Sequence, residues 1–186
     1  NGTIEENGCG KFNSFTPKAL KEIKKLGATH IWYTGILEHA TKTDYTAHGI
    51  LSDHPGVIKG NAGSPYAIKD FYDVDPDLAE NVNKRIEEFE ALIERTHKAG
   101  LKAIIDFIPN HTARQYYSDK KPKGVKDLGE GDNPNWAFSP LNNYYYMPGE
   151  QLRPTFNTGG YEEYPAKVTG NDQFSAHPTE FDWYET

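Results

Sequence analysis

The chain has 186 residues and a formal net charge of −7, a length that suits one domain or two small ones. Nucleic-acid-binding proteins usually present a basic face, so the acidic balance argues against a nucleic-acid partner. No apolar run approaches the ~18 residues that a membrane-spanning helix needs, and the single cysteine, Cys9, excludes an internal disulfide framework or a cysteine zinc cluster.

The amino terminus has neither a starting methionine nor the basic and then apolar segment of a secretory leader. The chain opens Asn1-Gly2-Thr3, and its single methionine is Met147. These features are expected of a piece excised from a longer protein. They leave the compartment of that parent protein open, with secretion and the periplasm both compatible.

A first helix is expected to begin near Thr16, a capping residue that is followed by Pro17. Gly27 is placed to end this helix. Residues 29–36 are rich in β-branched and aromatic side chains and predict a mostly buried strand of a parallel sheet. The expected apolar face of the helix consists of Ala19, Leu20, Ile23 and Leu26.

Residues 38–76 show no regular pattern and are expected to form a long functional loop. Its acidic residues, Asp70, Asp73, Asp75 and Asp77, are expected to be solvated. A second helix is predicted over 81–99, with Arg85 among its charged residues on the water side. The expected buried stripe of this helix consists of Val82, Ile86, Phe89 and Ile93.

Gly100 ends the second helix, and an apolar strand is predicted over 103–108. The order helix, glycine, strand therefore occurs twice, which is typical of βαβ units in a parallel sheet. Two strands leave sheet edges and apolar faces uncovered, so further strands are expected to complete the fold. Residues 113–186 are rich in Gly, Pro, Asn and Tyr and are expected to form a loop-built subdomain.

Polar residues follow the second predicted strand in the segment 106–112, which reads Asp-Phe-Ile-Pro-Asn-His-Thr. Active sites of parallel barrels lie at the carboxyl ends of the strands. Asp106 is expected to be buried in the strand, where a carboxylate requires a partner. His111 taken alone is compatible with an ordinary turn at the end of a strand.

The whole segment resembles the first signature of the α-amylase superfamily, glycoside hydrolase family 13. Residues 63–76 are similar to the segment that the same family carries between barrel strands two and three, and residues 26–32 are similar to its junction into strand two. The resemblance implies an α/β fold: a partial (β/α)8 TIM barrel over 1–112, about strands two and three with flanking helices. An irregular insertion of the domain B type, truncated, would follow over 113–186.

The resemblance also implies roles for individual residues. Tyr66 would stack on the sugar beside the scissile bond, and His111 would hydrogen-bond the hydroxymethyl group of that sugar. Asp106 would support the architecture of the site by pairing with an arginine on the next barrel strand. Asn110 would be a calcium ligand in calcium-dependent members, and no organic cofactor is implied. Ser64 stands where many members have a histidine that contacts the same sugar.

Catalytic carboxylates are expected to lie outside the chain. Retaining glycosidases use two carboxyl groups about 5–5.5 Å apart, and the family carries its nucleophile in an Arg-x-Asp sequence that is missing here. The expected function is that of a fragment of a retaining α-glucan hydrolase or transferase, inactive alone. Its expected partners are an α-glucan and the remainder of its own barrel. A non-catalytic barrel of the transporter-associated type and a stand-alone glycan-binding module are the alternatives.

Aromatic residues are frequent in the last third of the chain. Tyrosine combines a flat apolar face with a polar tip, which suits sugar rings. Most of these rings are expected to pack the subdomain, and a few are expected to line one wall of the cleft. The candidates for the wall are Trp136, Tyr144, Tyr145 and Tyr146.

Overall fold

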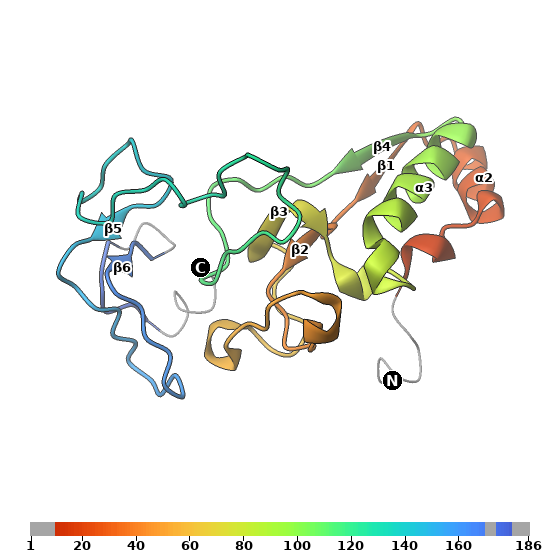
Figure 1. Ribbon diagram of the computed structural model, residues 1–186. Coiled ribbons are helices and arrows are strands. Elements are labelled where there is room, and N and C mark those ends of the chain that lie inside the picture. The colour runs from red at the N-terminus through yellow and green to blue at the C-terminus, as the bar shows by residue number, and fades with distance from the viewer. Residues whose placement is uncertain (1–9, 170–173, 180–186) are drawn as a thin grey trace. The chain divides into compact units, whose positions relative to one another are not determined.

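The computed structural model describes residues 10–169 and 174–179 (Figure 1). The chain divides into two compact units. The first unit comprises Asn1–Glu38 and Asp73–Phe107, and the second comprises His39–Tyr72 and Ile108–Thr186. Cys9 and three of the tail aromatics (Phe181, Trp183 and Tyr184) lie outside the described residues.

Regular secondary structure is concentrated in the first unit. Strand β1 pairs in parallel with β4, in a register that runs from His30 opposite Lys102 to Tyr33 opposite Ile105, as the repeated helix-glycine-strand order predicts. Helix α3 packs on β4, and α2 packs on α3 (Figure 1). The elements are η1 (Phe12–Ser14), α2 (Pro17–Lys25), β1 (His30–Tyr33), η4 (Pro76–Leu78), η5 (Val82–Lys84), α3 (Arg85–Lys98) and β4 (Lys102–Ile105).

Helix α2 begins and ends as its sequence predicts. The Thr16 hydroxyl accepts a hydrogen bond from the Ala19 amide at 3.2 Å, and Pro17 occupies the first helical position. Gly27 has a φ of +91°, the left-handed conformation that suits glycine after a helix. Leu20 is fully buried, but Leu26 is 88% exposed, so its expected place on the buried face was wrong. Leu26 is the capping residue of the last turn and still has helical dihedral angles, with its amide donating to the Glu22 carbonyl at 3.3 Å.

Helix α3 buries a different stripe from the predicted one. The predicted stripe is only partly buried, whereas Leu92 and Thr96 are fully buried. Arg85 is 2% exposed, so its expected place on the water side was wrong. Its Nε donates to both carboxylate oxygens of Asp73, at 3.0 and 2.8 Å. The paired carboxylate compensates the cost of burying the guanidinium charge.

The expectation of a solvated acidic loop was wrong as well. Residues 38–76 contain β2 (Leu37–His39, which begins just before them) and β3 (Ile68–Val74), and these strands form a two-stranded sheet. Asp70, Asp73 and Asp75 are buried. Each accepts hydrogen bonds from protein donors: Asp70 from the Tyr72 amide at 2.7 Å, and Asp75 from the Asp77 amide at 2.8 Å. Buried carboxylates with such partners are stable, and sequence composition alone does not reveal the partners.

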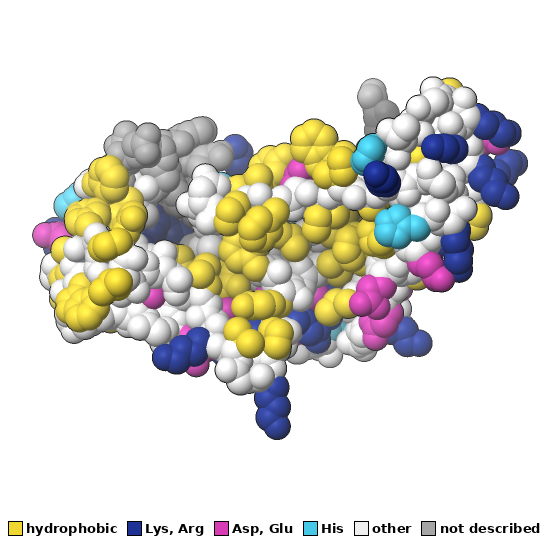
Figure 2. Space-filling view, turned by 90° about the horizontal axis from the view of Figure 1, so that it is seen from above, with side chains coloured by type: hydrophobic (Ala, Val, Ile, Leu, Met, Phe, Trp, Pro, Cys, Tyr) yellow, Lys and Arg dark blue, Asp and Glu magenta, His cyan; other side chains and the backbone are white. Residues whose placement is uncertain are grey.

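The sheet of the first unit has one exposed side, so the prediction of mostly buried strands was wrong in part. Side-chain exposure is 66% for Trp32, 47% for Ile104 and 62% for Phe107. Hydrophobic side chains are exposed over much of the face in Figure 2. The other side packs on a core that includes Tyr33, whose hydroxyl lies 2.7 Å from the Thr96 hydroxyl. Two strands cannot cover both of their own faces, which explains the contrast.

The second unit is mostly irregular, as its composition predicts. Its core joins Ile58, Ala67, Ala113 and Leu152, among other residues. Its short elements are η2 (Thr46–His48), η3 (Pro55–Val57), β5 (Tyr146–Met147) and β6 (Ala166–Lys167), the last two paired antiparallel. Among the described residues of both units, no helix has the length and apolar character to cross a bilayer.

Candidate functional site

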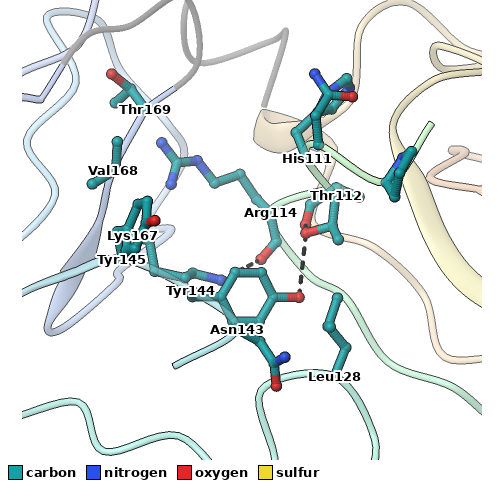
Figure 3. A pocket seen from close by; sticks show the side chains of 13 residues that line it. His111, Thr112, Arg114, Leu128, Asn143, Tyr144, Tyr145, Lys167, Val168 and Thr169 are labelled. Atoms are coloured by element: carbon teal, nitrogen blue, oxygen red, sulfur yellow. Dashed lines mark hydrogen bonds between the residues drawn. The ribbon is translucent and has the colours of Figure 1, made fainter. Parts of the chain in front are cut away.

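A cavity of about 250 Å³ lies in the second unit and contains the polar end of the signature segment (Figure 3). Small-molecule sites usually occupy roughly 300–1,000 Å³, so the cavity suits one small ligand group. Its lining residues come from three segments and one isolated position: Pro109–Arg114, Asn143–Tyr145, Lys167–Thr169 and Leu128.

The signature segment is anchored at the cavity by its neighbours. The Ala113 amide donates to the Ile68 carbonyl of β3 at 2.8 Å. The Thr112 hydroxyl donates to the Ala113 carbonyl at 2.9 Å and lies 3.3 Å from the Tyr144 hydroxyl, toward which it points in Figure 3. His111 is half-buried and Asn110 is exposed. Both side chains are therefore presented at the cavity from a fixed backbone.

Tyr144 forms part of the opposite wall and is held closely. Burial raises the pKa of its hydroxyl above the ordinary value. A Cβ at Gly129 would stand 2.6 Å from the Tyr144 ring, so this position needs glycine. The Lys167 ammonium lies 4.7 Å from the centre of the same ring, a cation–π distance.

Buried charges brace the cavity wall behind these residues. Arg114 pairs with Glu163 at 3.2 Å, and both side chains are almost fully buried. The Lys167 ammonium donates to the Arg114 carbonyl at 3.1 Å (Figure 3), and burial lowers the pKa of this lysine. The Tyr161 hydroxyl donates to Glu163 at 3.2 Å. No sequence pattern indicates Arg114, Glu163 and Lys167, because Arg114 lies 49 residues from Glu163 and 53 from Lys167.

Asp132 positions the tyrosine segment, which comprises residues 143–146. Its carboxylate accepts from the Asn143 amide at 2.7 Å, the Tyr144 amide at 2.9 Å and the Tyr146 hydroxyl at 3.2 Å. Burial, together with this carboxylate, raises the pKa of Tyr146 to about 12. The hydrogen bonds fix the segment before any ligand arrives. Asp132 is thus a positioning residue that the sequence patterns missed.

The family model described as the alpha amylase catalytic domain matches residues 4–161. The chain belongs to the alpha-amylase catalytic-domain family. The resemblance carried by residues 26–32, 63–76 and 106–112 is therefore confirmed. Membership supports a partial barrel type for the parallel strands β1 and β4.

The chain is similar to proteins whose names state different functions. The chain is 32% identical over 135 residues to pullulanase A of Streptococcus pneumoniae serotype 2, a match that covers 69% of this chain and 10% of that protein. It is 29% identical over 162 residues to an alpha-amylase of Streptomyces lividans, covering 86% of this chain and 16% of the relative. It is 46% identical over 57 residues to the amino acid transporter heavy chain SLC3A1 of Rattus norvegicus, covering 31% and 7%. The chain thus spans about a tenth of the pullulanase that it matches.

The cavity brings together only some of the residues that the sequence singled out. Asn110, His111, Tyr144 and Tyr145 line it. The described lining does not include Tyr66, Trp136 or Tyr146, of which Tyr66 and Trp136 are 45% and 50% exposed.

Asp106 lies in the first unit, just beyond the end of β4 at Ile105. It is half-buried and accepts a hydrogen bond from the Trp32 indole nitrogen. Its expected burial inside a strand was wrong, because β4 ends before it and one side of the sheet is exposed. The expected pairing of Asp106 with an arginine on the next barrel strand stays a prediction.

The cavity lining is a poor match for calcium. Calcium takes six to eight oxygen ligands, with carboxylates prominent among them. Asn110 offers an amide oxygen, but no described residue in the lining is a carboxylate, and two of them, Arg114 and Lys167, are cationic. A calcium ion at Asn110 would therefore need acidic ligands from other residues, and the calcium role of Asn110 stays a prediction.

Proposed function

We propose that the chain supplies part of the substrate cleft of a retaining α-glucan hydrolase. One observation carries the proposal: Asn110 and His111 of the signature segment share a cavity with Tyr144 and Tyr145. Sugar rings have apolar faces and polar rims, and tyrosine rings beside polar side chains complement both. Family membership and the names of the pullulanase and alpha-amylase relatives support an α-glucan as the substrate class.

His111 and Tyr66 have separate roles in this proposal. His111 donates a hydrogen bond to the hydroxymethyl group of the sugar at the reacting bond, and Tyr66 stacks on the same sugar. Asp106 supports the site without touching the substrate. Strands β1 and β4 correspond to barrel strands two and three, and residues 113–186 to a domain B-type insertion.

The reacting carboxylates come from residues outside this chain in the proposal. The Arg-x-Asp pattern of the family nucleophile does not occur, because no arginine of the sequence is followed two positions later by an aspartate. The arginines are Arg85, Arg95, Arg114 and Arg153. The chain supplies binding and orientation, which lower the barrier only when the nucleophile and acid/base are present. The reaction is hydrolysis or transfer to another sugar, both of which begin with the same covalent step.

Kinetics of the intact protein that contains these residues test the proposed roles. His111→Ala and Tyr66→Ala should each lower kcat/KM on maltooligosaccharides about ten- to a hundredfold, because each removes a contact of roughly 1–3 kcal/mol. The melting temperature should stay close to that of the wild type. His97→Ala, an exposed position on α3, is the matched control and should change neither quantity. Wild-type kcat/KM in either site variant would refute the role of that residue.

The 186-residue chain alone provides a second test. Incubated with starch and with an activated maltoside, it should release no sugar above the buffer blank. Turnover that co-purifies with the chain would show that it contains its own catalytic groups.

The exposed side of the β1–β4 sheet supports the expected partnership with further barrel strands. Trp32 and Phe107 are 66% and 62% exposed, an arrangement that favours association. The isolated chain should bind a hydrophobic dye and elute as oligomers in size-exclusion chromatography. A dilute monomer with a cooperative thermal transition would contradict this expectation.

The similarity to the transporter heavy chain favours a second candidate function. The chain is 46% identical to that protein over 57 residues. A non-catalytic barrel that accompanies a membrane transporter is therefore compatible with this sequence. Turnover of starch, pullulan and maltooligosaccharides by the intact protein separates the two candidates. Hydrolysis of any of these sugars excludes the non-catalytic barrel. If a correctly folded protein hydrolyses none of them, the hydrolase is excluded.

A further inference from the structure

Exposed lysines gather in the first unit where strands β1 and β4 begin. Each strand follows the end of a helix, and the two helix ends lie together: a Cβ at Gly100, just after α3, would stand 3.8 Å from the Lys24 side chain in the last turn of α2. Lysine and arginine side chains are frequent on the part of Figure 2 that α2 occupies. We call the group at these helix ends the basic edge, and it consists of Lys24, Lys25, Lys98 and Lys102, all of them exposed.

The positive charge of the basic edge is only weakly compensated. Lys25 pairs with Glu22 at 2.7 Å, and Lys98 pairs with Glu94 at 2.7 Å, but all four side chains are more than half exposed. Exposed pairs of this kind contribute little, because water screens them. The negative end of the helix dipole favours lysines in a last turn, which explains three of the four lysines. It does not explain Lys102, which lies in a strand.

A leucine projects from the same edge. Leu26 directly follows Lys24 and Lys25 and is 88% exposed, more than any other large hydrophobic residue in the described part of the chain. Its amide donates to the Glu22 carbonyl at 3.3 Å, so the side chain starts from a fixed turn of backbone. Covering Leu26 with protein would also bury the adjacent lysines, whose charges would then need partners. An apolar side chain among exposed lysines is instead typical of surfaces that enter the interface of a lipid bilayer.

We propose that the basic edge and Leu26 form a contact site for the anionic surface of a phospholipid bilayer. The lysine ammonium groups bind phosphate headgroups, and the leucine side chain enters the boundary between headgroups and acyl chains. The leucine favours a bilayer over a soluble polyanion, because only the bilayer offers an apolar layer beneath its negative charge. Strands β1 and β4 run away from this edge, so the contact directs their carboxyl ends, where active sites of parallel barrels lie, away from the lipid.

Cosedimentation of the intact protein with vesicles tests the contact site. The wild type should bind vesicles of phosphatidylcholine mixed with phosphatidylglycerol more tightly than vesicles of phosphatidylcholine alone, and added salt should reduce the difference. The double variant Lys24→Gln/Lys102→Gln should lower the partition coefficient about thirtyfold, because each lysine near an anionic surface contributes on the order of fivefold. Leu26→Ser should lower it about threefold to tenfold, because the apolar contact with the lipid is lost.

Matched variants in the second unit control for charge and apolar area. Lys42→Gln/Lys123→Gln removes the same charge at exposed positions, and Leu141→Ser removes a leucine that is 82% exposed, so neither should change vesicle binding.

Three results would overturn the proposal. The first is a wild type that does not prefer the anionic vesicles, and the second is an equal loss of binding in the control variants. The third is a loss in the lysine variant without a loss in Leu26→Ser, because the edge would then recognise charge alone, as a site for a soluble polyanion does. The vesicles contain no sugar, so each result is independent of the proposed glucan cleft.

Discussion

The two units of the chain satisfy their polar groups in different ways. In the first, backbone groups pair within helices α2 and α3 and between strands β1 and β4, and Arg85 and Asp73 form a buried guanidinium–carboxylate pair. In the second, side chains such as Asp132 satisfy the backbone of long loops, and the buried pairs Lys69–Asp53 and Arg114–Glu163 brace them. The helices and strands of the first unit can be predicted from the periodicity of its apolar residues. The irregular unit depends on individual polar residues, and it contains the cavity.

The largest expected effect concerns the buried pair of the first unit. Arg85→Met leaves the Asp73 carboxylate buried without its partner, which should lower the free energy of unfolding by about 3–5 kcal/mol. Chemical denaturation of the intact protein measures this loss. Lys98→Ala is the matched control, because it breaks an exposed pair with Glu94 and should cost less than about 0.5 kcal/mol. Equal losses for the two variants would remove the distinction between buried and surface charges.

The second prediction addresses Asp132 in the second unit. Asp132→Asn removes the negative charge and replaces one of the two carboxylate oxygens that accept from three donors. The free energy of locally opening the tyrosine segment should fall by about 1–3 kcal/mol. The pKa of Tyr146 should fall from about 12, because the carboxylate that helps to raise it is gone. Hydrogen exchange at the Asn143 and Tyr144 amides and an ultraviolet titration measure both effects. Glu162→Gln, at an exposed position, should change neither.

A smaller effect is expected at the start of α2. Thr16→Ala removes the hydroxyl that accepts from the Ala19 amide and should cost about 1 kcal/mol, whereas Thr16→Ser should retain the cap. The free energy of unfolding from denaturation curves distinguishes the two variants. If alanine and serine behave alike, the cap makes no contribution to the first unit.

The smallest expected effect is a slope of stability against pH caused by Lys167. Burial lowers the pKa of its ammonium in the folded state below the ordinary 10.5. Between the lowered value and 10.5 the unfolded chain therefore binds more protons, and stability should rise with pH in that window. Lys167→Met should flatten the slope in denaturation curves recorded from pH 7 to about pH 10, below the range in which tyrosines ionise. An unchanged slope would assign the pH dependence to other groups.

Much of the first unit followed from the sequence alone. The cap at Thr16, the terminating Gly27 and Gly100 and the apolar strand cores depend on residues within a few positions of one another. The segments 26–32, 63–76 and 106–112 are likewise local patterns, and together they predict the family that the matching family model shows. Local signals of this kind act within a single turn or strand, so the structure that they predict does not depend on contacts with distant parts of the chain.

Tertiary structure alone decided which charged and aromatic groups meet. Arg85 and Asp73, which form a hydrogen bond, are 12 residues apart in the sequence. The separation is 32 residues for Thr112 and Tyr144, and 53 residues for Lys167 and Arg114. A carboxylate or guanidinium in sequence appears solvated until its partner is known, since burial is tolerated only when the charge is paired. The composition of the cavity wall depends on such distant contacts. The sequence named His111 and Tyr144 as candidates for one cleft, whereas the contact that joins their segments, between the Thr112 and Tyr144 hydroxyls, depends on the tertiary structure.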